Sequence, residues 1–204
     1  MITYPLSLPP TPGYSKINFT ATNVVGITRS PFTLQQQVYQ WQGEGWSVSV
    51  SMPPMSQPTA EAWMTFLVSL RGTLGTFYLG DPAHSAPRGT TGGTPVVNTA
   101  QSSMSSTLMT RGWTSGATFL AGDFIQLGTG VQQRLYKVLT NQTANTGGFI
   151  TFDIFPVLRE GVSDAQPITL LNPAGTFRLT KDTRVFDMDA AYIFGIDFAC
   201  EEAL

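Results

Sequence analysis

The sequence predicts a mainly β fold: a β-sandwich domain with one flanking α-helix, plus an inserted second small β domain, either barrel or sandwich. Short segments of alternating polar and apolar residues recur along the 204 residues, and Gly, Pro and Asn separate them. Residues 57–71 form the single segment in which apolar residues follow a helical spacing. A chain of this length accommodates one large β domain with a second domain inserted into it.

The N-terminal half predicts a hairpin over residues 31–52. In its second strand, Trp46, Val48, Val50 and Met52 alternate with serines, which gives one apolar face. The turn is expected at residues 43–45, whose sequence is Gly-Glu-Gly. Residues 17–19 predict a short strand, whereas the Pro-rich residues 1–13 are expected to be extended but outside any central strand.

A helix is expected after Pro53 and Pro54, which end the preceding strand. Glu61 is expected in its first turn and Arg71 in its last, where the helix dipole favours each charge. Gly72 supplies the stop, and residues 73–79 predict a strand. The apolar face of the helix comprises Ala60, Trp63, Met64, Leu67 and Leu70.

Composition shifts near residues 82 and 182 divide the chain. We expect residues 1–82 and 183–204 to form the first domain, and residues 83–182 to form the insertion. Residues 83–107 are rich in Gly, Ser, Thr and Pro and are expected to be a long loop or linker. Further strands are predicted at residues 126–127, 134–139, 149–154, 167–172, 175–179 and 192–200.

The composition points to a protein that buries much of its surface against neighbours. Only 12% of residues are charged, about half the usual share. The net charge is −2 and no run of Lys or Arg occurs, so neither nucleic-acid binding nor a membrane partner is predicted. An ordinary extracellular β-sandwich of similar composition remains an alternative. No basic leader precedes the Pro-rich start, so synthesis in a cytoplasm is expected. Cys200, the single cysteine, is expected to be a small buried residue.

No catalytic residue, metal site or cofactor site is predicted, and the chain is not expected to be an enzyme. Asp81, His84 and Ser85 lie in one Pro-containing loop, whereas the members of a catalytic triad come from separate elements. One His and one Cys, far apart, do not make a metal site. A hydrolase using paired carboxylates stays an alternative. Its nonspecific candidates are Asp81, Asp123, Asp153, Asp187 and Asp189.

Aromatic residues leave a second alternative open, a carbohydrate-binding module. Sugar-binding sites stack ligand rings on exposed aromatic side chains, and Trp41, Trp46 and Trp113 lie near predicted turns. Packing in a core or an interface is the competing interpretation of these three residues.

Three blocks of sequence, in this order, resemble the distal tail proteins and tail-tip minor tail proteins of siphophages. The second block covers residues 120–128 and 135–138, and the third covers residues 154–159. Phe198 to Glu201, a strand that leads into acidic residues, is also similar, and the resemblance spans roughly residues 30–204. The first block is a helix-Arg-Gly-strand-Gly-Asp-Pro pattern made by Trp63, Phe66, Leu67, Leu70, Arg71, Gly72, Gly75, Phe77, Leu79, Gly80, Asp81 and Pro82.

The resemblance implies a structural component of the virion, located at the tail tip or baseplate. Such proteins form a homo-oligomeric ring, usually a hexamer, between the tail tube protein and the tail-tip hub protein. Their ring-forming domain is similar to a tail-tube subunit, and the second β domain projects outward, where it can hold a tail fibre or receptor-binding protein. DNA passes through the lumen during ejection without specific binding. Another tail-tube or minor tail component is the nearest alternative.

In such a ring, we expect residues 33–52 to line the lumen or the contact between subunits, with the helix at 59–71 outside. Low-charge strands rich in Gln, Ser and Thr suit the heterologous faces that close a ring. The candidate subunit-interface residues are Gln35, Gln37, Tyr39, Trp41, Trp46, Val48, Arg71, Phe77 and Asp81.

Overall fold

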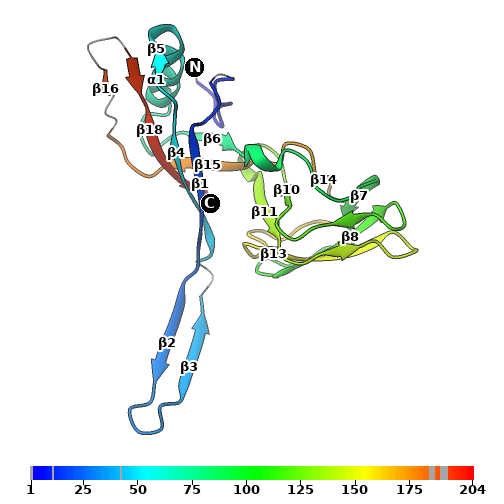
Figure 1. Ribbon diagram of the computed structural model, residues 1–204. Helices are drawn as coiled ribbons and strands as arrows, with labels where there is room; N and C mark the ends of the chain where they lie inside the picture. The colour runs from blue at the N-terminus through cyan, green and yellow to red at the C-terminus, as the bar shows by residue number, and fades with distance from the viewer. Residues whose placement is uncertain (1, 11, 42, 184–186, 189–192) are drawn as a thin grey trace.

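A computed structural model describes residues 2–10, 12–41, 43–183, 187–188 and 193–204 (Figure 1). Within these residues the chain forms several antiparallel sheets, one α-helix and a six-stranded, nearly closed barrel-like sheet. The predicted mainly β class with a single flanking helix is therefore confirmed.

A five-stranded antiparallel sheet joins both ends of the chain. Its central strand is β18, which lies between β4 and β15, so the C-terminal segment completes a sheet begun near the N-terminus. The outer side of β6 is covered by Leu6, whose backbone exchanges hydrogen bonds with Thr76 and Tyr78. In spatial order the strands are β1 (Lys16–Thr22), β4 (Gly45–Ser51), β18 (Asp197–Glu202), β15 (Gly175–Leu179) and β6 (Thr76–Leu79).

The helix α1 (Gln57–Ser69) contributes one side of the core of this sheet, as its apolar spacing predicts. The ring of Trp63 lies 6.2 Å from that of Phe198. The helix ends where Arg71 and then Gly72 take left-handed conformations, with φ of 51° and 71°. The dipole prediction was wrong, because Glu61 lies beyond the first turn and Arg71 lies outside the helix.

The barrel-like sheet occupies the middle of the chain. A bridge between Val96 and Pro167 links its two ends and nearly closes it. The expectation of a long loop at 83–107 was wrong, since this stretch contains the 3-10 helix η1 (Pro82–His84) and β7. In spatial order the strands are β14 (Ile168–Thr169), β10 (Phe124–Leu127), β11 (Arg134–Val138), β13 (Phe149–Phe155), β8 (Thr107–Trp113) and β7 (Gly93–Val97).

The remaining pairings are short. One is β9 with β12, and β17 pairs with both β5 and β16. A second 3-10 turn, η2 (Gly130–Gln132), precedes β11. The strands are β5 (Met55–Ser56), β9 (Thr118–Phe119), β12 (Gln142–Thr143), β16 (Asp187–Met188) and β17 (Ile193–Gly195).

The five-stranded sheet and the barrel-like sheet pack against each other and share part of one core. Strand β15 was predicted in the insertion, but it pairs with β6 and β18 of the five-stranded sheet. In addition, Phe124 of the barrel strand β10 packs into the core of the five-stranded sheet, 5.9 Å from the Trp46 ring.

The predicted hairpin over residues 31–52 was wrong in its pairing. Strand β4 pairs with β1 and β18, whereas β3 (Gln36–Gln40) pairs with β2 (Val25–Arg29). The turn lies at residues 30–35 instead of 43–45. The mistake arose because the strand partner of β3 precedes it in the sequence, where few residues alternate clearly.

A buried charged cluster, the Arg159 cluster, lies where β3 leads into β4 beside the barrel. It comprises Glu44, Arg159 and Glu202. One terminal nitrogen of Arg159 donates to the Glu44 carbonyl and also to a Glu202 carboxylate oxygen, 2.9 Å away. The Glu44 carboxylate accepts the backbone N–H of Val157 at 2.9 Å. The side chains of Arg159 and Glu202 are 7% and 3% exposed. These bonds therefore join three segments that lie far apart in sequence.

Replacing Arg159 with Met should lower the free energy of unfolding by about 3–5 kcal/mol, because it leaves a buried carboxylate without its partner. Urea denaturation followed by tryptophan fluorescence measures this change. The double variant Arg159→Met, Glu202→Met should recover most of the loss. Arg29→Met, at an exposed position, is the matched control and should change stability by less than about 0.5 kcal/mol. Equal stability of the Arg159 variant and the wild type would contradict the proposed importance of the cluster.

Tyr136, whose hydroxyl accepts the backbone N–H of Arg159 at 3.2 Å, should make stability sensitive to alkaline pH. Burial raises the pKa of Tyr136 to about 12 from the ordinary value of 10.0. The unfolded chain then loses this proton first, so the contribution of Tyr136 to stability is constant below pH 10 and falls as the pH rises towards 12. Unfolding measured from pH 8 upward should show a shallower alkaline decline for Tyr136→Phe, and an equally steep decline would contradict this assignment.

Candidate functional site

The most distinctive surface feature is an arm, defined as residues 24–41. It consists of β2 and β3 joined by a tip at residues 30–35, and Figure 1 shows that it extends away from both sheets. In its register, Ile27 lies opposite Val38. Among the described residues, neither outer edge of this two-stranded ribbon has a strand partner. The arm is therefore an open ribbon with unsatisfied backbone edges.

Both faces of the arm carry exposed apolar side chains. Residues directly opposite in an antiparallel pair share one face, so Val25, Ile27 and Val38 form an aliphatic face. Tyr39 and Trp41 lie on the opposite face. All five are exposed, and Trp41 retains 63% of its accessible surface. Contiguous exposed apolar surface of this kind marks a protein–protein or ligand contact.

The tip is an ordered turn that presents Phe32 to solvent. The Ser30 hydroxyl accepts the backbone N–H groups of Phe32 and Thr33, and the Ser30 carbonyl accepts the N–H of Leu34. Leu34 has a left-handed backbone with φ of 60°, which costs energy in a residue with a branched side chain. Phe32 is 94% exposed. The turn thus holds a large apolar ring where it has no contact with its own core.

Charge is nearly absent from the arm. Arg29 is its single charged residue, and glutamines supply most of its polar groups. An isolated two-stranded ribbon is only marginally stable in water. Long exposed edges without charges also favour pairing with another chain. The arm therefore has the chemistry of a surface that becomes covered by another protein.

The predicted interface residues divide between surface and core. Gln35, Gln37, Tyr39 and Trp41 lie exposed on the arm, Arg71 is exposed just after α1, and Asp81 is partly exposed. Trp46, Val48 and Phe77 are instead buried in the core of the five-stranded sheet, where their side chains pack within the same subunit. Alternation along a strand marks an apolar face but does not show whether that face is covered by the same chain or by a partner. Phe32 and Ile27 were missed, although an apolar residue in a Pro-containing turn is a usable signal.

Three of the five candidate carboxylates, those of Asp81, Asp123 and Asp153, have structural partners. Asp123 is buried and accepts the Arg88 guanidinium at 2.7 Å as well as the backbone N–H of Leu120. Asp153 accepts the hydroxyl of Thr140. Asp187 begins β16, and Asp189 lies outside the described residues. Asp123 therefore fixes the loops around β10, which accounts for its burial.

The loop acid Asp81 has a local role as well. Its carboxylate accepts the backbone N–H of Ala83 at the start of η1 and lies 2.8 Å from the His84 ring. Among the described residues, the His84 ring makes no hydrogen bond to the Ser85 hydroxyl. Within the same residues, no group of three or more His, Cys, Asp and Glu is placed to hold a metal ion.

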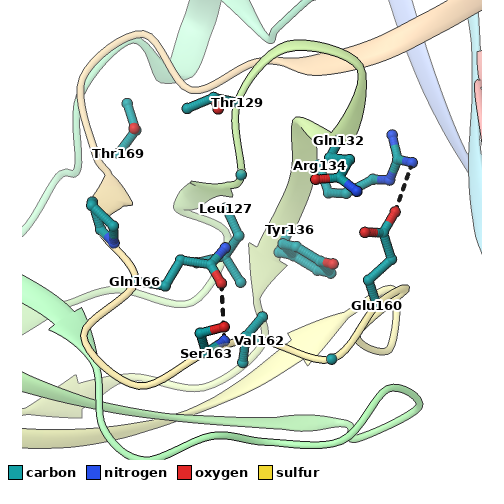
Figure 2. A pocket seen from close by; sticks show the side chains of 13 residues that line it. Leu127, Thr129, Gln132, Arg134, Tyr136, Glu160, Val162, Ser163, Gln166 and Thr169 are labelled. Atoms are coloured by element: carbon teal, nitrogen blue, oxygen red, sulfur yellow. Dashed lines mark hydrogen bonds and ion pairs between the residues drawn. The ribbon is translucent and has the colours of Figure 1, made fainter.

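A groove of about 420 Å³ opens on the barrel, beside β10 and β11 (Figure 2). Two of its polar side chains have partners within the groove: Arg134 contacts Glu160 at 3.2 Å, and Gln166 accepts the backbone N–H of Ser163. Tyr136 is buried and offers no exposed ring. The Arg134 Nε lacks an acceptor, but it is shielded from solvent and therefore also from a ligand in the groove. These features give little support to a ligand site here.

The tryptophans considered for sugar stacking are mostly internal. Trp46 and Trp113 are 5% and 4% exposed, so both are core residues and that reading is corrected for them. The Trp113 indole N–H donates to Thr110, and its ring packs 5.1 Å from that of Phe119. Trp41 alone of the three retains a broad exposed surface.

No model of a protein family matches the chain, and no curated protein is significantly similar to it. Among the described residues, no helix is both long and apolar enough to cross a membrane.

Trypsin should cleave the monomeric protein first at Arg29. No other Lys or Arg lies between Lys16 and Arg71, and an isolated ribbon opens readily to a protease. Mass spectrometry should find the fragments 1–29 and 30–204 early in a time course. Arg29→Gln should abolish this cut and leave other sites unchanged. If cuts in the barrel or in the core sheet precede the cut at Arg29, the arm is more stable than proposed.

Proposed function

We propose that the protein is a non-catalytic structural subunit of a siphophage tail tip. In this proposal it forms a ring, with six copies as the expected number, that joins the tail tube protein to the tail-tip hub protein. The ring leaves a channel through which DNA passes without specific binding. The protein is assembled into the virion after synthesis in the host cytoplasm, and the barrel, projecting outward, can hold a tail fibre or receptor-binding protein.

The observation that carries the proposal is the exposed arm. Its apolar faces, its unpaired edges and its single charge fit a contact with another protein and would be a liability on an isolated monomer. An arm that leaves one subunit and is received elsewhere on the next makes a heterologous contact. Contacts of this type close into rings when the rotation between subunits permits.

The architecture supports the same proposal. A β-sheet flanked by one helix, with a second β unit inserted, is the arrangement expected from the resemblance to distal tail proteins. The net charge of −2 also fits a channel that does not retain DNA, because phosphate binding needs clustered Lys and Arg. Another tail-tube or minor tail component would share these features and remains the nearest alternative.

A carbohydrate-binding module is the second candidate, and a single observation favours it. Trp41 presents an exposed ring next to a groove at the base of the arm. Glycan-array binding by the monomer that is lost in Trp41→Ala would support this candidate over the ring.

The purified full chain should assemble into rings that light scattering and negative-stain electron microscopy detect as its concentration rises. A variant that replaces residues 25–40 with a short Gly-Ser turn should stay monomeric at every concentration. The core should tolerate this change, since the backbones of Val24 and Trp41 are already linked by a hydrogen bond of 2.8 Å.

Circular dichroism and the urea midpoint establish that the shortened variant folds. Val131→Ser, an exposed apolar position on the barrel, is the matched control and should assemble like the wild type. A wild-type chain that stays monomeric at all concentrations, or a shortened variant that assembles normally, would overturn the proposal.

A further inference from the structure

A second exposed apolar feature lies at the base of the arm. This arm-base groove has a volume of about 410 Å³ and runs between Gln40 and Trp41 of the arm and the adjoining part of the barrel. Met104, Leu139 and Phe155 supply apolar walls on the barrel side. Met104 and Leu139 are both exposed. The groove therefore leaves uncovered the kind of surface that a protein core would bury.

The groove is as ordered as the tip. Met104 has a left-handed backbone with φ of 70°, like Leu34 at the tip, and its N–H donates to the Leu158 carbonyl at 2.6 Å. A non-glycine residue in this conformation persists only where its surroundings hold it. Both features thus present apolar side chains from backbone that costs energy to maintain.

The single acid that lines the groove is already satisfied. The Glu44 carboxylate accepts the amide of Gln40 on one oxygen and the Val157 N–H on the other. This carboxylate is already buried and hydrogen-bonded, so an apolar group entering the groove would remove little water from it. The occupant that fits is apolar and uncharged.

We propose that the arm-base groove of one copy receives the tip of the arm, led by Phe32, from a neighbouring copy of this chain. This inference rests on the proposed ring and names the contact that would build it. The tip matches the groove in chemistry: Phe32 and Leu34 are apolar, and Arg29, the nearest charge on the arm, precedes the turn.

The tip of the arm cannot reach the arm-base groove of its own chain. The tip is separated from Trp41 by the five residues of β3, which span about 17 Å at roughly 3.3 Å per residue. Figure 1 shows the tip at the far end of the arm from the barrel. Because tip and groove are different patches of one subunit, each copy offers one of each to its neighbours. Such a contact propagates from copy to copy until it closes.

Disulfide trapping in the full chain tests this contact while Phe32, Met104 and Leu139 stay in place. Thr33→Cys puts a thiol beside Phe32 at the tip, and Ser106→Cys puts a nearly isosteric thiol in the groove wall. Cys200 is buried in the core and is left unchanged. After mild oxidation at assembling concentrations, the double variant should give a ladder of covalent dimers, trimers and larger species on a non-reducing gel.

The stoichiometry of the ladder distinguishes this contact from random collision. An equal mixture of the two single variants should give covalent dimers and nothing larger, because each subunit then carries one new thiol. The pair Thr33→Cys, Ser163→Cys, which places the second thiol at the other barrel groove, should give no ladder. In addition, Phe32→Ser should weaken assembly at least tenfold in concentration, whereas Phe32→Leu should largely preserve it.

The failure of this inference can be told from failure of the ring. Rings that assemble while the Thr33, Ser106 pair gives no ladder would overturn the tip-in-groove contact and leave the proposed function standing. Rings unaffected by Phe32→Ser would do the same. A chain that never assembles would overturn both.

Discussion

The arrangement of the molecule depends on the buried bonds of Arg159. Its guanidinium, between the Glu44 carbonyl and the Glu202 carboxylate, ties the base of the arm and the last strand to a loop of the barrel. A buried ion pair contributes little net stability compared with apolar packing, but it tolerates only one geometry. The cluster therefore links the segment after the arm, the last strand and a loop of the barrel at one buried point. The aromatic contact between Trp46 and Phe124 reinforces this junction with apolar packing.

The arm extends from this junction and carries exposed apolar side chains that suit an interaction surface. An isolated two-stranded ribbon is only marginally stable in water. This ribbon also has exposed apolar faces and a surface with a single charge. A ring subunit gains from such an arm because the surface is hidden only after assembly. If the tip of one copy enters the groove beside the next arm, the Arg159 cluster would set the angle between successive copies. The angle would in turn decide whether the assembly closes.

Several residues of the types found in catalytic sites have structural roles in this protein. Asp123 is buried under Arg88, Asp81 begins a 3-10 turn, and Arg134 in the barrel groove pairs with Glu160. The same holds for Trp113, whose position near a turn suggested exposure but whose ring lies inside the barrel. Residue types common to catalytic and sugar-binding sites thus serve here to hold loops and fill cores.

The sequence by itself determined the mainly β class, the single helix and its buried face, and most of the strands. These features depend on local periodicity and on Gly and Pro, which act over a few neighbouring residues. Only the tertiary structure decided which strands pair, that β15 belongs with β6 and β18, and that Trp46, Val48 and Phe77 point inward while Phe32 points outward. Alternation gives a strand two faces, but the partner that covers one of them comes from distant parts of the chain. The arm and its groove are therefore visible only after the fold has left them uncovered.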